Sequence, residues 1–182
     1  IPGRVLVLAL QEALLDNLRG LYDACLEQGR IPLMWKIGKL VLLRKEGRNL
    51  ESPSAYRPIV LLDEVGKLLE RIIAARIVKH MNTVGPNLSD TQFGFRVGRS
   101  TIDAIGRVKT LAENAVSQGE VVLAVSLDIA NAFNTLPWSC IGEALRYHGV
   151  PSYLRQVVED YLSDRFVECQ TQEGMRRWKM SC

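Results

Sequence analysis

The most constraining feature of the sequence is the apolar run at residues 121–127, which ends in an acid at Asp128. Valine, leucine and alanine follow one another almost without a break, as in a strand that is covered on both faces. Such a run predicts a sheet with other elements packed against it. Polar residues at the end of a buried strand are often functional, because rigid scaffolds present chemistry in the loops that follow them.

Two roles are open for Asp128 on the strand pattern alone. A carboxylate in this position can bind Mg²⁺, which prefers oxygen ligands and is typically held by one or two carboxylates together with substrate phosphates. The same side chain can instead cap the following turn as an ordinary Asx residue. No second acid follows closely, and Asn134 stands where one might be expected.

Hydrophobic periodicity along the rest of the chain predicts an α+β fold. Three helices are predicted at residues 5–28, 64–82 and 100–118, and the last begins with a capping-box pattern at Ser100. Strand and loop alternate over residues 36–62, and a β-hairpin is predicted around Gly174. Two short helices are predicted between the strand and this hairpin. We therefore expect helices packed on a small antiparallel sheet.

The composition excludes several classes of protein. Only two histidines are present, and the four cysteines (Cys25, Cys140, Cys169 and Cys182) lack metal-ligand spacing, so neither a zinc site nor a disulfide framework is expected. Free thiols in a reducing, intracellular compartment are the simpler interpretation. No apolar run approaches the ~18–20 residues that span a membrane. The net charge of +3 permits nucleic acid as a partner without requiring it.

Basic side chains gather in loops that contain glycine or proline, among them Lys45, Arg57, Arg96 and Arg99. Arginine can hold phosphate oxygens with two parallel hydrogen bonds, and lysine adds a point charge. Glycine lets the backbone approach a phosphate closely. Each cation can also be an ordinary surface residue, but their clustering favours a site for a polyanion.

Four segments occur in an order that resembles the fingers and first palm segment of a reverse transcriptase: "WKIGKLVLLRKEGR", "SAYRPIVLLDEVGKLLERII", "LSDTQFGFRVGRSTIDAI" and "VSLDIANAFNTLPW". The resemblance is closest to non-LTR (LINE-type) retrotransposons, and within these to elements that insert in insect ribosomal DNA. It implies a partial right-hand polymerase. Residues 1–120 would form a fingers-like region, and residues 121–182 would form the N-terminal part of the palm.

The resemblance implies a role for each matching residue. Asp128 would be the first catalytic aspartate and would bind two Mg²⁺ ions, with Mn²⁺ as an alternative, and the main-chain carbonyl of Ile129 would be a further ligand. Phe133 would be the steric gate that rejects ribonucleotides. Lys45 and Arg57 would grip the incoming triphosphate. The segment that braces the template would comprise Gln92, Gly94, Phe95 and Arg96.

The function implied is that of an RNA-directed DNA polymerase in the nucleus, with an RNA template, a DNA primer and deoxynucleoside triphosphates as partners and no membrane. The chain departs from the family's pattern, because the family's later motif with paired aspartates is absent from residues 129–182. We therefore expect the isolated chain to be inactive and the strand at 121–127 to expose apolar surface. A catalytically dead nucleic-acid-binding remnant or domesticated module is the alternative.

Overall fold

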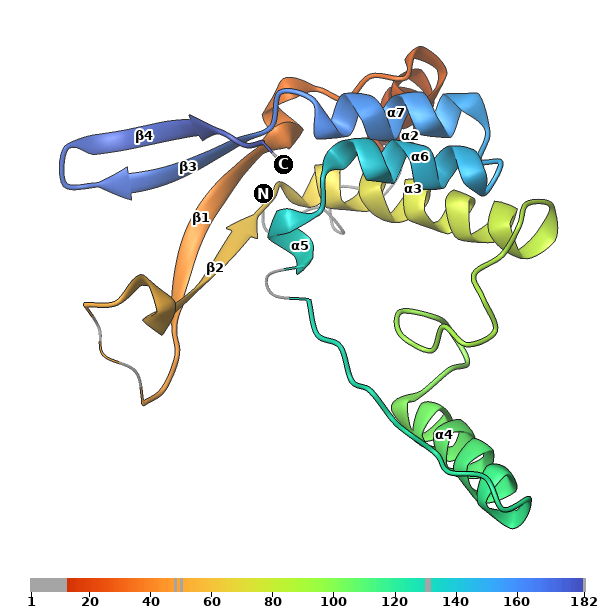
Figure 1. Ribbon diagram of the computed structural model, residues 1–182. Coiled ribbons are helices and arrows are strands. Elements are labelled where there is room, and N and C mark those ends of the chain that lie inside the picture. Colours follow the sequence, from red (N-terminus) through yellow and green to blue (C-terminus); the bar gives the residue numbers. More distant parts are fainter. Residues whose placement is uncertain (1–12, 48, 50, 130–131, 182) are drawn as a thin grey trace. The chain divides into compact units, whose positions relative to one another are not determined.

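The computed structural model describes residues 13–47, 49, 51–129 and 132–181 (Figure 1). The chain divides into two compact units. The first unit combines residues 1–85 with residues 136–182, and the second consists of residues 86–135. Within the described residues, none of the helices combines the length and the apolar character that crossing a bilayer requires.

Four strands in the first unit form one sheet, with the order β2-β1-β3-β4. Strands β1 (Ile37–Arg44) and β2 (Tyr56–Leu61) pair antiparallel, as do β3 (Phe166–Thr171) and β4 (Gly174–Lys179), which confirms the hairpin predicted around Gly174. The central pair, β1 with β3, is parallel. The sheet is therefore mixed, and the prediction of an antiparallel sheet is wrong for its central pair.

The helices of the first unit are α2 (Ala13–Gln28), α3 (Glu64–Thr83), α6 (Trp138–Tyr147) and α7 (Ser152–Leu162). The described part of the helix predicted at 5–28 is α2, and the helix predicted at 64–82 is α3. Two 3-10 turns complete the unit, η1 (Leu33–Lys36) and η2 (Pro53–Ala55). The α+β class is thus observed.

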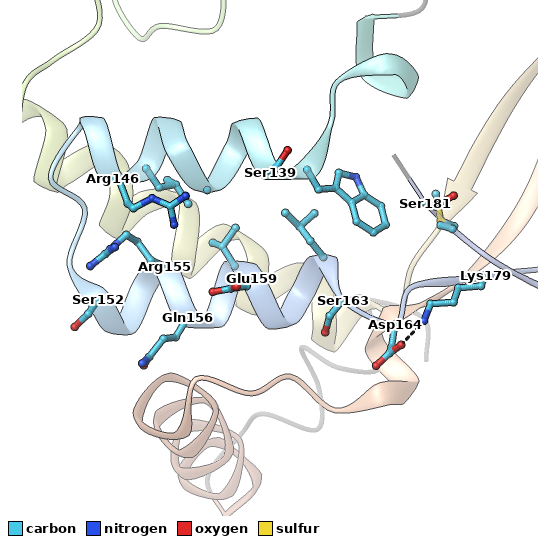
Figure 2. Close-up of a pocket in the computed structure, with 16 residues that line it drawn as sticks. Ser139, Arg146, Ser152, Arg155, Gln156, Glu159, Ser163, Asp164, Lys179 and Ser181 are labelled. Carbon is cyan, nitrogen blue, oxygen red and sulfur yellow. Dashed lines mark hydrogen bonds and ion pairs between the residues drawn. The ribbon is translucent and has the colours of Figure 1, made fainter.

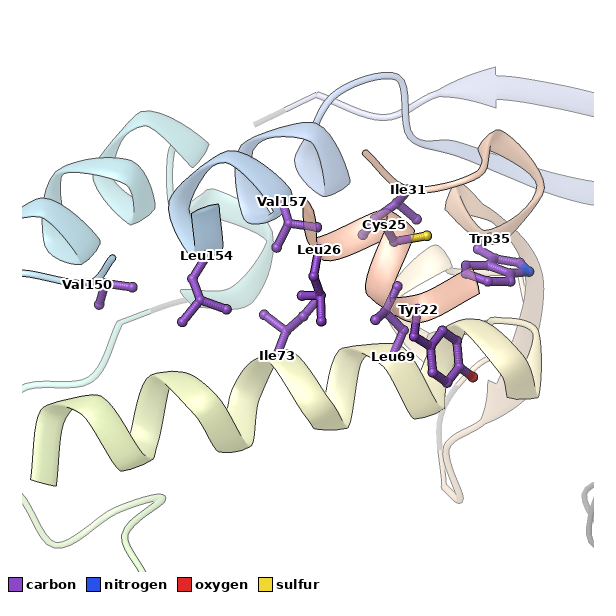
Figure 3. Packing of buried hydrophobic residues seen from close by; sticks show 10 residues of the cluster. All are labelled: Tyr22, Cys25, Leu26, Ile31, Trp35, Leu69, Ile73, Val150, Leu154 and Val157. Carbon is purple, nitrogen blue, oxygen red and sulfur yellow. The ribbon is translucent and has the colours of Figure 1, made fainter. Parts of the chain in front are cut away.

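The core lies among the helices and not between the helices and the sheet (Figure 3). Leu69 of α3 and Leu154 and Val157 of α7 are its most deeply buried side chains. Tyr22 of α2 packs edge-on against Trp35 of η1, with ring centroids 6.0 Å apart. The expectation that helices pack on the sheet is therefore wrong. Most residues of the strands are exposed or half-buried, because the apolar faces of the helices pack against one another.

One position in the sheet requires glycine. Gly38 is buried in β1, and a Cβ atom at this residue would lie 2.1 Å from Cγ1 of Val60 on β2. The side chain of Val60 therefore occupies the space that a side chain at residue 38 would need. This contact fixes how the start of β1 lies against β2.

The second unit contains α4 (Thr101–Ser117) and the single turn α5 (Ala132–Thr135). The predicted capping box is confirmed, because Ser100 Oγ accepts from the backbone N–H of Asp103, and Asp103 Oδ2 accepts from the backbone N–H of Ser100. The carboxyl of Asp103 has a pKa below its ordinary value, chiefly because of the hydrogen bonds from Ser100. The helix predicted at 100–118 is therefore α4.

The strand predicted at residues 121–127 is not observed. These residues have no regular secondary structure, and Val121 and Leu127 are 97% and 89% exposed. A strand exists only where a neighbouring strand accepts and donates its backbone hydrogen bonds. No described residue pairs with this segment, so its apolar sequence has no sheet to join. The expectation of exposed apolar surface in this segment is confirmed.

Candidate nucleotide and nucleic-acid interface

The two residues predicted to grip the triphosphate lie at one end of the β1–β2 hairpin. Arg57 is opposite Leu43 in the antiparallel register. Lys45 follows β1, and its backbone N–H donates to the carbonyl of Ala55 at 2.8 Å, which continues the ladder by one residue. Because side chains alternate between the two faces of a sheet, Leu43, Lys45 and Arg57 share one face. The structure therefore brings Lys45 and Arg57 together.

The two cations differ in how they are held. Lys45 is half-buried, and its Nζ donates to the carbonyl oxygen of Ser54 at 3.1 Å. Arg57 is exposed, and among the residues that the structure describes no carboxylate pairs with either side chain. Both positive charges are therefore available to an anion from solvent.

The same face of the sheet carries further cations that the sequence analysis did not single out. Lys39 is opposite Glu168 in the parallel pair, and Glu168 is opposite Arg177 in the β3–β4 hairpin. Arg177 Nε donates to Glu168 Oε1 at 2.7 Å, and so this acid is already neutralised. Lys39 is exposed. The alternation of strand residues was a signal that could have placed Lys39 on the same face as Arg57, four residues away along the β1–β2 ladder, once the register was known.

The predicted template segment lies in a loop of the second unit that is stabilised by its own side chains. Arg96 Nη1 donates to the carbonyl of Ser89 at 2.8 Å, and Gln92 Nε2 donates to the carbonyl of Gly94 at 3.1 Å. Phe95 is 97% exposed and has a positive φ of 57°, which is uncommon for a residue with a side chain. Gln92, Gly94, Phe95 and Arg96 thus form one local turn with an aromatic side chain held out to solvent.

Asp128 and Ile129 lie in the irregular segment that follows α4, and both are exposed. Within the described part of the chain, no three acidic, histidine or cysteine side chains come together as a metal site. One carboxylate with one carbonyl is too few ligands for two divalent ions, which a two-metal site holds ~3.5–4 Å apart. The donor set of the described residues therefore does not fit a complete two-metal site. The side chains of Phe133 and Asn134 lie outside the described residues.

The predicted site residues are divided between the two units. Lys45 and Arg57 belong to the first unit, whereas Gln92 to Arg96 and Asp128 belong to the second. That these groups act on one substrate stays a prediction. Residues 136–182 belong to the same unit as the β1–β2 hairpin. The assignment of residues 121–182 to the N-terminal part of a palm stays a prediction.

A buried ion pair near the start of β1 was also missed. Lys36 Nζ lies 2.7 Å from Asp160 Oδ2 on α7, and the same oxygen accepts the backbone N–H of Ile31 at 2.7 Å. The side chain of Lys36 is only 6% exposed. Burial, with Asp160 as a second cause, raises the pKa of the nearby Cys25 thiol. No sequence pattern distinguishes Lys36 from a surface lysine, because its partner lies far along the chain.

Three cysteines, Cys25, Cys140 and Cys169, are free thiols, as the sequence predicts. Cys182 lies outside the described residues.

Comparison with known proteins assigns the family. The family model described as "Reverse transcriptase (RNA-dependent DNA polymerase)" matches residues 43–181. The chain is 36% identical over 147 residues to a probable RNA-directed DNA polymerase from transposon BS of Drosophila melanogaster, which covers 80% of this chain and 16% of that protein. It is 37% identical over 134 residues to a Pol polyprotein from the type-1 retrotransposable element R1 of Bradysia coprophila, covering 73% of this chain and 13% of the relative.

A third relative, the RNA-directed DNA polymerase from mobile element jockey of Drosophila melanogaster, is 30% identical over 158 residues, which are 86% of this chain and 17% of that protein. The chain thus spans less than a fifth of these relatives. The resemblance to polymerases of non-LTR retrotransposons is confirmed. The match to the family model begins near the end of β1 and continues past the end of β4. The chain therefore belongs to the reverse transcriptase (RNA-dependent DNA polymerase) family.

Proposed function

We propose that this chain is part of an RNA-directed DNA polymerase of a non-LTR retrotransposon, which extends a DNA primer on an RNA template with deoxynucleoside triphosphates. The family match over residues 43–181 carries this proposal. Relatives that match most of the chain have names that include RNA-directed DNA polymerase. Its place of action would be the nucleus, where chromosomal DNA supplies the primer.

In this proposal, Lys45 and Arg57 bind the triphosphate of the incoming nucleotide. Their common face at the end of the β1–β2 hairpin supports the assignment, because a triphosphate needs cations that converge on neighbouring oxygens. Neither cation is paired with a carboxylate among the described residues, so no ion pair has to break before phosphate binds. Lys45 would exchange the Ser54 carbonyl for a phosphate oxygen.

Reverse transcriptases generally use divalent metal ions. Asp128 and the carbonyl of Ile129 would be two of the ligands for Mg²⁺ or Mn²⁺, and further carboxylates would have to complete the set. Phe133 would lie under the sugar of the nucleotide and exclude a 2′-hydroxyl.

The loop of Gln92, Gly94, Phe95 and Arg96 would contact the template. Its features support this role, because an exposed aromatic ring can stack on a base and an arginine can approach the sugar–phosphate backbone. Arg96 is tied to loop carbonyls in the structure, so it would hold the loop in shape while Phe95 makes the contact.

Primer extension tests the proposal. A polypeptide that carries these 182 residues within a longer reading frame is expected to extend a DNA primer on poly(rA), and Asp128→Ala is expected to abolish extension. Arg57→Ala and Lys45→Ala should raise the KM for the nucleotide, because each removes a charge-assisted contact worth ~1.5–3 kcal/mol. Lys67→Ala is the matched control, since Lys67 is paired with Glu64 on the surface of α3.

The assay also separates the alternative. Extension that survives Asp128→Ala would refute the assignment of Asp128. Binding of the RNA template without any extension, at equal strength with and without Asp128, would support the nucleic-acid-binding remnant instead.

A further inference from the structure

A groove of about 710 Å³ runs between α6 and α7 and ends beside the last residues of β4 (Figure 2). All of its lining residues belong to the first unit, and none is a residue to which the proposed polymerase function assigns a role. Residues at helical spacing line it from both helices, for example Trp138, Gly142 and Leu145 on α6. The groove therefore follows the facing sides of the two helices.

One end of the groove is cationic. Figure 2 shows Arg146 projecting from α6 toward α7, where Arg155 lies at the same end. The guanidinium of Arg146 folds back over the helix, because a Cβ atom at Gly142 would lie 3.8 Å from its Nη2. Arg155 Nε is buried and has no hydrogen-bond partner. Among the residues that the structure describes, neither arginine forms an ion pair.

The remainder of the groove is mostly apolar. Half-buried apolar side chains line it, namely Trp138, Leu145, Val158, Leu162 and Met180. At the far end Lys179 Nζ is already paired with Asp164 Oδ1 at 2.7 Å, so this end carries no free charge. From Trp138 to Arg146 helix α6 rises ~12 Å, at about 1.5 Å per residue. A ligand that fits would be apolar over most of this length, with an anion at one end.

We propose that the groove between α6 and α7 binds a peptide segment of a partner protein that carries apolar side chains and one carboxylate. The carboxylate is held between Arg146 and Arg155, the two cations that lie at this end of the groove. The apolar side chains cover the middle of the groove, in the manner of an amphipathic helix in a hydrophobic groove.

Charge favours a peptide over a nucleic-acid strand in this groove. Glu159 lies on the same lining as Arg155, one helical turn away. A strand of nucleic acid carries a phosphate at every nucleotide, so it would bring negative charge toward Glu159 and along the apolar part of the groove. A peptide needs only one anion, at the end where the two arginines lie.

Panning a phage-displayed library of random dodecapeptides against the 182-residue chain tests the proposal. The double variant Arg146→Gln, Arg155→Gln serves for counter-selection. Enriched peptides are expected to contain an Asp or Glu among leucine-type residues, and their affinity should fall ~10–100-fold in the double variant. Replacing the acid of the peptide by its amide should cause a similar loss in the wild-type chain.

A second variant acts by shape and not by charge. Gly142→Leu adds a side chain to the groove, and its Cβ would meet only the flexible end of Arg146. It should block the peptides while the far-UV circular dichroism stays unchanged. Arg71→Gln on α3 is the matched control, because Arg71 is an exposed arginine of the same unit that does not line the groove.

The proposal is overturned if panning enriches no peptide that separates the wild-type chain from the double variant. It is also overturned if the enriched peptides bind Gly142→Leu as well as they bind the wild-type chain. A fluorescein-labelled uridine dodecamer tests whether the groove binds nucleic acid instead. If this oligonucleotide binds and is lost in the double variant, the groove is a nucleic-acid site and not a peptide site.

Discussion

Replacing Asp160 by asparagine should destabilise the first unit by about 2–3 kcal/mol. The change leaves the ammonium of Lys36 in a site where its side chain is only 6% exposed, without the carboxylate that lies 2.7 Å from it. Removing one partner of a fully buried pair costs ~3–5 kcal/mol. The cost here should be lower, because the side chain of Asp160 is 26% exposed and the asparagine oxygen can still accept a hydrogen bond.

Replacing the other partner of the pair, Lys36, should lower the free energy of unfolding by less. Lys36→Met keeps the apolar stem of the lysine and leaves Asp160, which is more exposed and still accepts the N–H of Ile31. We expect a loss of about 1 kcal/mol. The difference between the two variants follows from the difference in burial, so the order of the two values is the decisive quantity.

Urea unfolding followed by tryptophan fluorescence measures both values. All three tryptophans (Trp35, Trp138 and Trp178) lie in the first unit, so the signal reports on that unit. Glu159→Gln is the control, because this neighbour on α7 is exposed and should change the free energy of unfolding by less than ~0.5 kcal/mol. If Lys36→Met costs as much as Asp160→Asn, the reasoning from burial is refuted.

Three further changes have expected outcomes. Gly38→Ala should lower the urea midpoint, because its Cβ would lie 2.1 Å from Val60 Cγ1, and adding Val60→Ala should restore much of the loss. Ser100→Ala should reduce the helicity of a peptide that spans α4, measured by circular dichroism, because it removes the cap. Burial, together with the hydrogen bond to Glu70, raises the pKa of Tyr161 to about 12. The folded-state pKa therefore exceeds the ordinary 10.0, which means that the folded state favours the neutral phenol of Tyr161. The stability that depends on this neutral phenol is complete below pH 10 and is lost as the pH rises toward 12. Spectrophotometric titration should show one fewer late-titrating tyrosine in Tyr161→Phe; an unchanged titration curve would contradict this assignment.

The parts of the fold that depend on neighbouring residues could be predicted from the sequence. The bounds of α3 and α4 follow from helical periodicity and capping, and the β3–β4 hairpin follows from alternation around Gly174. The parallel pairing of β1 with β3 could not be predicted, since Ile37 and Phe166 are brought together by everything that lies between them. The Lys36–Asp160 pair escaped prediction for the same reason.

The candidate site likewise combines features that local sequence predicts with features that depend on residues far apart in the chain. That Lys45 and Arg57 are cations in loops is visible in the sequence, but their common face depends on the register of β1 with β2. The groove between α6 and α7 gave no signal, because Arg146 and Arg155 come from different helices and look like ordinary surface residues. Family resemblance assigned roles to single residues, and the structure decided which of those residues are neighbours.

The segment at residues 121–127 shows where a sequence preference stops being sufficient. Its valines and leucines favour a strand, but β-propensity expresses how well a side chain fits a pleated and partly buried surface, and not what an isolated backbone does. Among the described residues nothing pairs with this segment, and it is therefore irregular and exposed. Helix α4 is amphipathic too, and its Ile105 and Val108 are 69% and 61% exposed. The second unit thus exposes two apolar surfaces, one on residues 121–127 and one on α4. The position of Asp128 depends on what packs against them. A carboxylate becomes a metal ligand only when its strand is held in place. In the proposed polymerase, the position of Asp128 would therefore depend on the elements that pair with residues 121–127 as much as on the residue itself.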